Sequence, residues 1–207
     1  MTSRPSPRAT VRPSFYASPA QIVARRLIGR WLISTVDGEE TIGRIVETEA
    51  YIGPHDEASH AATRIGRTRR NATMHGPPGI AYIYRSYGIH WCLNVVTDEP
   101  GFPAAVLIRA IEPVSGVLCM RGRRCVGDAA AVDSLGRGPG NLTVALGITG
   151  ALDGHPLDRP PLVLARGTRV RADRIAVGPR IGITRSVDWP LRFHLIGNAC
   201  VSRPRVS

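Results

Sequence analysis

The sequence predicts an α+β fold: a single domain with a mainly antiparallel, curved β-sheet, hairpins and surrounding short helices. Apolar and β-branched runs occur in pairs joined by short turn-like links, which is typical of hairpins. Helical spacing of apolar residues is confined to short stretches between these runs. With 207 residues, of which 43% are hydrophobic, the chain is long enough to bury the core of one domain.

The predicted domain covers residues 18–207, after a flexible basic tail over residues 1–17 that is rich in Pro, Ser and Arg. The domain opens with an amphipathic helix capped by Ser18 and ending near Gly29. Its apolar positions are Ile22, Val23, Leu27 and Ile28.

Strand-like patterns follow from Trp31 onwards. Residues 31–36 and 41–49 form a predicted hairpin, which places Glu49 near a strand end. A second hairpin is expected with Tyr87 at its tip, formed by strands at 79–84 and 89–97. The remaining expected elements are short helices at 56–62, 114–123 and 141–146, an Arg-rich loop at 63–76, a loop at 124–140, and strands at 104–111, 161–166, 180–185 and 191–196.

The charge of the chain indicates a polyanionic partner. A net charge of +11 and a pI near 10.8 favour nucleic acid, because Arg side chains neutralise phosphates and release counterions. A ribosome-associated or membrane-surface protein would show the same balance, although the sequence has no basic amphipathic helix. No apolar run approaches about 18 residues, so we expect a cytoplasmic protein. The four cysteines are irregularly spaced, which favours buried free thiols over a zinc site.

All 27 basic residues are Arg, and the chain contains no Lys. A glycosidic-bond enzyme that also cleaves the DNA backbone generally needs an amine nucleophile, and here only the N-terminal amine is left. The composition therefore disfavours a lyase step.

Candidate chemistry begins with Glu47 and Glu49, which are spaced by two and should share one face of a strand. Taken alone, the pair fits the solvated surface of an edge strand better than a catalytic site. The surrounding sequence favours a functional site instead. Tyr and His side chains and an Arg-rich loop follow within about 45 residues. Aromatic rings can stack on bases, and Arg side chains can contact phosphates. Tyr87 at a hairpin tip has no core to join and suits a wedge.

Several blocks of the chain closely resemble the alkyladenine (3-methyladenine) DNA glycosylase family of the mammalian type, with this chain as a bacterial member. The matches keep their order from about residue 14 to about residue 205. They are ETEAYIGP at 47–54, DEASH at 56–60, YIYRSYG at 82–88, Asn94, LIRAIEP at 107–113 and GPGNL at 138–142.

The resemblance implies a role for each matched residue. Glu49 would be the general base that activates water, and Arg109 the partner that holds Glu49 and the water in place. The flipped base would be enclosed by Tyr51, His60 and Tyr84 and checked by Asn94, which meets the exocyclic amine of normal guanine. Tyr87 would fill the gap left in the duplex.

The implied activity is monofunctional base-excision repair of double-stranded DNA, by base flipping and without a metal or other cofactor. Expected lesions are 3-methyladenine, 7-methylguanine, hypoxanthine and ethenoadenine, and the expected state is a monomer associated with a bacterial nucleoid. Ile89 and His90 depart from the bulkier Met-aromatic pair of mammalian members, which affects the expected wedge geometry.

Three alternatives stay open at this point. A noncatalytic nucleic-acid-binding protein would need the charge and the aromatics but not Glu49 with Arg109. A bifunctional lyase would need an amine. A metal-dependent hydrolase would draw on His55, His60, His75 or His90 with Asp56 and Glu57, although their spacing matches no zinc motif.

Overall fold

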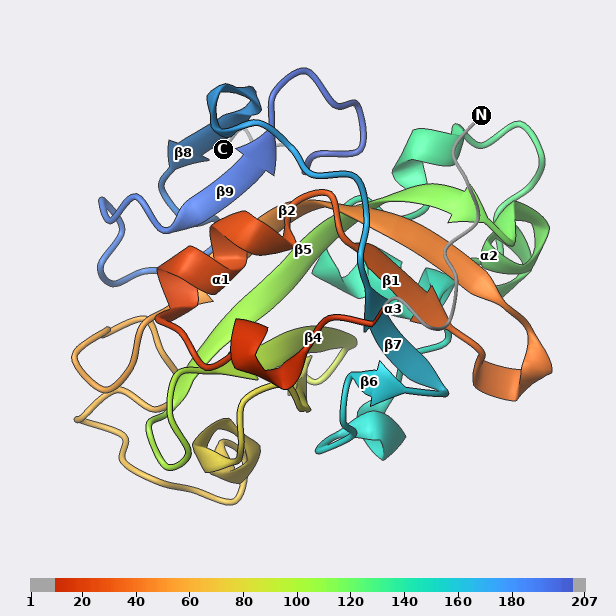
Figure 1. The fold of residues 1–207 in the computed structure, drawn as a ribbon. Coiled ribbons are helices and arrows are strands. Elements are labelled where there is room, and N and C mark those ends of the chain that lie inside the picture. The colour runs from red at the N-terminus through yellow and green to blue at the C-terminus, as the bar shows by residue number, and fades with distance from the viewer. Residues whose placement is uncertain (1–9, 203–207) are drawn as a thin grey trace.

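The structure is a computed structural model that describes residues 10–202 (Figure 1). Its helices are α1 (Ala20–Leu27), α2 (Val117–Arg123) and α3 (Pro139–Ala145). Its strands are β1 (Trp31–Ser34), β2 (Thr41–Tyr51), β3 (Ala81–Ser86), β4 (His90–Thr97), β5 (Ala104–Ser115), β6 (Asp158–Arg159), β7 (Leu162–Ala165), β8 (Ile175–Gly178) and β9 (Arg192–Leu195). Short 3-10 turns include η3 (Ala72–His75) and η6 (Ala172–Arg174).

The described strands form one sheet in which every pairing is antiparallel. The order is β3-β4-β5-β2-β1-β7-β6, with β9 on β2 and β8 on β9. β5 follows β2 along one side, whereas the other side of β2 meets first β1 and then β9. The α+β fold with a curved antiparallel sheet is therefore confirmed, and β2 lies at its centre.

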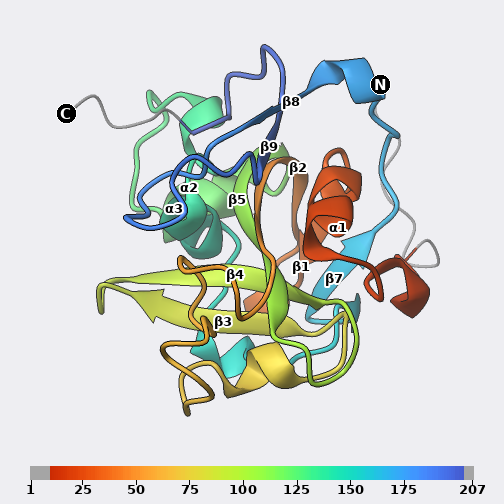
Figure 2. The same ribbon diagram turned by 90° about the vertical axis from the view of Figure 1, so that its left-hand side faces the viewer.

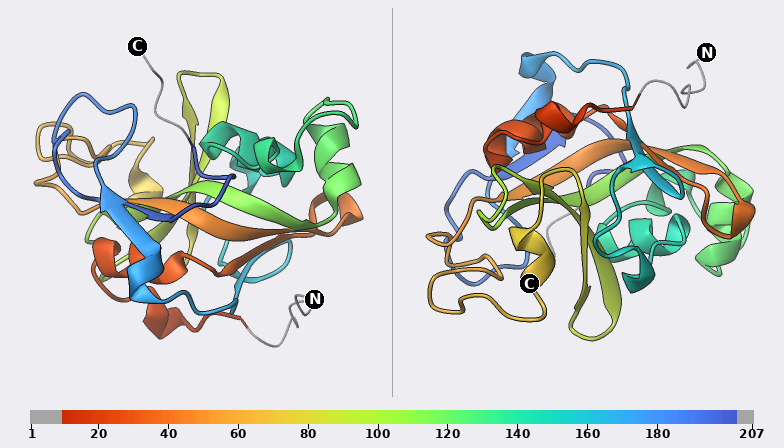
Figure 3. Two further views of the ribbon diagram at one scale, coloured as in Figure 1. Left: turned by 90° about the horizontal axis from the view of Figure 1, so that it is seen from above. Right: turned by 60° about the horizontal axis from the view of Figure 1, so that its bottom comes forward.

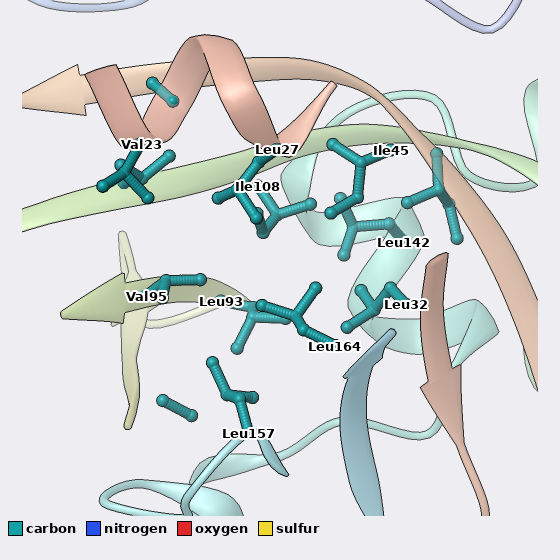
Figure 4. Packing of buried hydrophobic residues seen from close by; sticks show 14 of the residues in the cluster. Val23, Leu27, Leu32, Ile45, Leu93, Val95, Ile108, Leu142, Leu157 and Leu164 are labelled. Carbon is teal, nitrogen blue, oxygen red and sulfur yellow. The ribbon is translucent and has the colours of Figure 1, made fainter. Parts of the chain in front are cut away.

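The two faces of β2 have different neighbours. Thr48 donates a hydrogen bond from Oγ1 to the Ala24 carbonyl of α1 at 2.9 Å, so its face is covered by that helix. α1 buries Val23 and Leu27 there, and Figure 4 shows Leu27 next to Ile108 of β5. Because side chains alternate along a strand, Glu47 and Glu49 belong to the opposite face.

Two predicted elements are wrong, and one interaction accounts for both. Residues 56–62 form turns instead of a helix, and residues 180–185 form bends instead of a strand. Asp56 accepts hydrogen bonds from the Ala58 and Ile52 N–H groups and pairs with Arg180. This buried ion pair determines the backbone course of both segments. The neighbouring strand β8 ends earlier, at Gly178.

The beginning of the packed domain also differs from the prediction. Val11 and Tyr16 are buried, so the packed part begins before residue 18, and residues 1–9 of the expected tail lie outside the described residues. Pro19 precedes the first turn of α1, and no side chain, that of Ser18 included, caps this helix.

The cysteines are free thiols, as expected, although only Cys92 and Cys200 are buried and Cys125 is exposed. Within residues 10–202, no helix is both long and apolar enough to cross a membrane.

Candidate active site

Glu49 lies in the interior, with none of its surface exposed, although it is an acidic residue. β2 carries it between β5 and β9, where it is paired with Leu107 and Arg192. Glu47 is equally buried on the same strand. Both carboxylates contact Arg109, so they share one face as predicted, and a solvated edge strand is excluded.

The Glu49 carboxylate has one strong partner and several looser ones. Oε1 accepts a hydrogen bond from the Ile181 N–H at 2.8 Å, whereas Arg109 Nη1 lies 3.4 Å from Oε1 and the Tyr51 hydroxyl 3.3 Å from Oε2. Burial raises the pKa of the Glu49 carboxyl above its ordinary value, and Arg109 and the Ile181 N–H oppose this. Glu49 therefore has an increased affinity for a proton. Its Oε2 atom has no short contact and is free to accept one.

Arg109 is held by a second set of contacts on its other edge. Its Nε donates to Ser202 Oγ at 3.0 Å and lies 3.5 Å from Glu47 Oε1. With 12% of its side chain exposed, the guanidinium is fixed between the two carboxylates. It can orient Glu49 without forming the short, bidentate pair that would lower the basicity of that carboxylate most.

Glu47 is the most fully hydrogen-bonded carboxylate of the site. It accepts from Arg192 Nε at 2.6 Å and from Ser202 through both N–H, at 2.8 Å, and Oγ, at 2.6 Å. Arg192 also donates to the Ser202 carbonyl at 3.1 Å. Sequence reasoning singled out Glu47 but missed Arg192 and Ser202, which lie about 150 positions away and carry no local motif.

His60 and Tyr84 are in contact, and Tyr51 adjoins Glu49. The His60 and Tyr84 rings meet edge to face with centroids 4.3 Å apart, and His60 Nδ1 lies 3.0 Å from the Tyr82 hydroxyl. Burial and the nearby Arg70 lower the pKa of His60 to about 4, so the imidazole is neutral at physiological pH. Tyr51 reaches the group through its contact with Glu49, and the electrostatic effect of that carboxylate extends to Tyr84. These are aromatic surfaces beside a buried carboxylate.

A buried ion pair that the sequence did not reveal supports Tyr51. Arg180 binds both oxygens of Asp56, at 2.5 and 2.8 Å, and donates to the Ala50 carbonyl at 3.0 Å. Its guanidinium lies 4.7 Å from the centre of the Tyr51 ring, within the range of a cation–π contact. Arg180 directly precedes Ile181 in the chain. The ion pair therefore fixes the position of the Ile181 N–H that binds Glu49.

Asn94 is buried on β4 opposite Tyr82 and donates from Nδ2 to the Tyr82 carbonyl at 3.1 Å. That bond satisfies a backbone group, which is the structural role that a strand Asn often has. Asn94 also pairs with Leu107, whose partner across β5 and β2 is Glu49, so the amide lies two strands from the carboxylate.

Tyr87 lies apart from this cluster, at the tip of the β3–β4 hairpin. It is 87% exposed and has a φ of +51°, a conformation that non-glycine residues rarely adopt. Ile89 beside it is also exposed. The hairpin projects from the body of the protein in Figure 3. The exposure of Tyr87 confirms the predicted exposed aromatic at the hairpin tip.

In the described part of the chain, no group of three or more His, Cys, Asp and Glu side chains is placed to hold a metal ion. His60 instead contacts the two tyrosines, and His75 lies near the Gly101 carbonyl, at 3.3 Å. The metal-hydrolase alternative therefore lacks a ligand set among these residues.

Comparisons with known proteins identify the family of the chain. The family model described as methylpurine-DNA glycosylase (MPG) matches residues 14–199. A protein of Rhodopseudomonas palustris (strain HaA2), named "Putative 3-methyladenine DNA glycosylase", is 49% identical over 98% of this chain and 96% of its own length. A Myxococcus xanthus protein with the same name is 48% identical over 92% of both chains. The chain belongs to the methylpurine-DNA glycosylase family, whose enzymes remove alkylated bases in DNA repair.

Proposed function

We propose that this enzyme is a monofunctional glycosylase that flips a damaged purine out of duplex DNA and hydrolyses its N-glycosidic bond with water activated by Glu49. The observation that carries the proposal is a buried carboxylate with a raised pKa, held by Arg109 and adjoined by aromatic rings. A carboxylate buried only for structure should be fully paired, as Glu47 is, whereas Glu49 keeps an oxygen without a short contact.

The proposed chemistry needs only this chain and water. Glu49 takes a proton from the water as its oxygen forms a bond to the anomeric carbon. The bond from that carbon to the base nitrogen breaks, and its electron pair leaves with the base. For a purine alkylated at N3 or N7, this pair neutralises the positive ring, so a modest catalyst suffices. Arg109 keeps Glu49 in place throughout.

The aromatic residues supply the base-binding surface in this proposal. Tyr51, His60 and Tyr84 stack against the flipped purine, and a cationic purine gains from the electron-rich faces of the rings. Neutral His60 adds no repelling charge. Asn94 would disfavour normal guanine, and exposed Tyr87 would insert into the duplex. The substrates proposed are 3-methyladenine, 7-methylguanine, hypoxanthine and ethenoadenine, bound by an enzyme monomer.

Base release from a duplex that carries one of these lesions tests the proposal. The free base should appear together with a DNA strand that carries an abasic site and that breaks only on treatment with alkali. Borohydride should trap no adduct of protein and abasic DNA, because the chain has no Lys and the proposed mechanism does not use the N-terminal amine. Tight binding without release of any lesion would instead support the noncatalytic alternative, and a trapped adduct would overturn the monofunctional mechanism.

A further inference from the structure

Eight arginines lie close together around α1, η6 and the middle of β2. This arginine face consists of residues from α1, from the start of β1, from β2 and from the segment around η6, namely Arg25, Arg26, Arg30, Arg44, Arg166, Arg169, Arg171 and Arg174. Six of them are exposed, and Arg30 and Arg44 are half-buried. Two ion pairs involve the face, between Arg44 and Glu112 and between Arg171 and Asp173. Among the described residues, the other six arginines have no carboxylate within ion-pair distance.

These arginines are close to one another in space. Arg25 donates to the Ala172 carbonyl of η6 at 3.2 Å, which ties the helix to the segment that follows β7. Arg44, Arg169, Arg171 and Arg174 line one hollow of about 410 Å³ together with residues 195–198. Burial and the charges of Arg166 and Arg169 lower the pKa of Arg30, as expected where like charges crowd. An Arg-rich composition explains the residue type but not this clustering.

Apart from Arg44, which lies on the same face of β2 as Glu47 and Glu49, the arginine face and the catalytic centre lie on opposite sides of the sheet. Thr48 of β2 faces α1, whereas its neighbours Glu47 and Glu49 face away. Figures 2 and 3 agree, since α1 and η6 lie on one side and the tip of the β3–β4 hairpin projects from the other. A duplex held against Glu49 and Tyr87 would have to bend around the domain to reach the arginines. DNA has a persistence length of about 50 nm, so a bend this sharp is costly.

We propose that the arginine face binds the phosphodiester backbone of a second DNA duplex while the catalytic face holds the first. Arginines without carboxylate partners are suited to phosphates, and the face offers them over an open surface without base-reading requirements. Binding there is nonspecific and salt-dependent, with an affinity on the order of 10⁻⁴ to 10⁻⁶ M. Holding two duplexes would let the enzyme pass from one DNA segment to another without full release.

The test uses the full chain bound to an immobilised duplex that contains an abasic site, the product of its reaction. A fluorescent, undamaged duplex is then added at low salt, and the amount retained is measured as salt rises. The test variant is Arg169→Ser with Arg174→Ser, two exposed side chains with no hydrogen-bond partner among the described residues. The control, Arg121→Ser with Arg159→Ser, removes the same charge outside the arginine face.

The proposal predicts that the wild type and the control retain the second duplex. The Arg169/Arg174 variant should retain at least fivefold less, and the slope of log affinity against log salt should fall by about 2. Single-turnover base release should be equal in all three proteins. Capture by none of them, or equal losses in both variants, would overturn the proposal. Preferential capture of phosphatidylglycerol vesicles would overturn its assignment to DNA. Failed base release with intact capture would refute the proposed function alone.

Discussion

Glu47 and Glu49 are equally buried and two positions apart on β2, yet they have different surroundings. Glu47 accepts three hydrogen bonds of 2.6 to 2.8 Å from Arg192 and Ser202. Glu49 has one bond of that length, and its contacts with Arg109 and Tyr51 are 3.3 Å or longer. The saturated carboxylate stabilises the site, and the undersaturated one retains the capacity to take a proton. Burying a charge is costly, so a structural carboxylate needs hydrogen bonds to all of its oxygens. A carboxylate that acts as a base needs an oxygen that is not fully hydrogen-bonded.

The largest effect on stability is expected from Glu47→Ala. Removing the carboxylate leaves Arg192 and Arg109 without their shared partner, and breaking a buried pair in this way costs about 3–5 kcal/mol. Denaturant unfolding of the variant and the wild type measures the difference. Glu112→Ala is the matched control, because its pair with Arg44 is partly exposed and should contribute about 1 kcal/mol at most. Equal losses in the two variants would show that Glu47 is not the anchor described here.

A smaller effect is expected from Ser202→Ala. The hydroxyl donates to the Glu47 carboxylate and accepts from Arg109, and a hydrogen bond to a charged group contributes about 1.5–3 kcal/mol. Ser134→Ala serves as the control, since the Ser134 hydroxyl bonds only an exposed backbone carbonyl. A free energy of unfolding for Ser202→Ala equal to that of the control would contradict the role of Ser202 in holding the two charges.

The smallest effect, and one of opposite sign, is expected from Glu49→Gln. Because burial raises the pKa of Glu49, folding favours its protonated form. The stability that this form contributes is complete below the pKa of the unfolded state and is lost as pH rises through the higher pKa of the folded state. Gln resembles the protonated form and should escape this loss. Thermal unfolding from about pH 4 to about pH 8 should therefore show the variant gaining on the wild type as pH rises. A variant whose stability falls relative to the wild type as pH rises would refute the raised pKa of Glu49.

The pH dependence of base release follows from the same sign. Glu49 must be ionised to accept a proton, so the rate should rise with pH through the raised pKa of the folded enzyme and not through the ordinary range of a Glu side chain. Single-turnover rates across this range measure the acidic limb. An acidic limb in the ordinary range would mean that the DNA complex compensates for the burial of Glu49.

The sequence revealed the parts of the fold and site that depend on local patterns. Alternating apolar residues and a short link predicted the β3–β4 hairpin and the exposed position of Tyr87. The spacing of Glu47 and Glu49 predicted their shared face, because alternation along a strand needs no distant information.

What the sequence did not reveal depends on distant partners. Arg180 pairs with Asp56 across 124 positions, and this pair replaces the strand expected at 180–185 with bends. Arg192 and Ser202 bind Glu47 across 145 and 155 positions. An isolated Arg or Ser in a short apolar segment gives no sign that it will meet a buried carboxylate, since only the folded sheet brings them together.

The most direct test of the central claim compares single-turnover base release by the wild type and Glu49→Gln on a duplex with one alkylated adenine. The enzyme is saturating, and binding to an abasic duplex confirms that the variant still recognises DNA. Loss of a general base should lower the rate by about 10²–10⁴-fold while this binding is retained. A variant that releases the base within about threefold of the wild-type rate would contradict the account, because general base catalysis typically contributes far more.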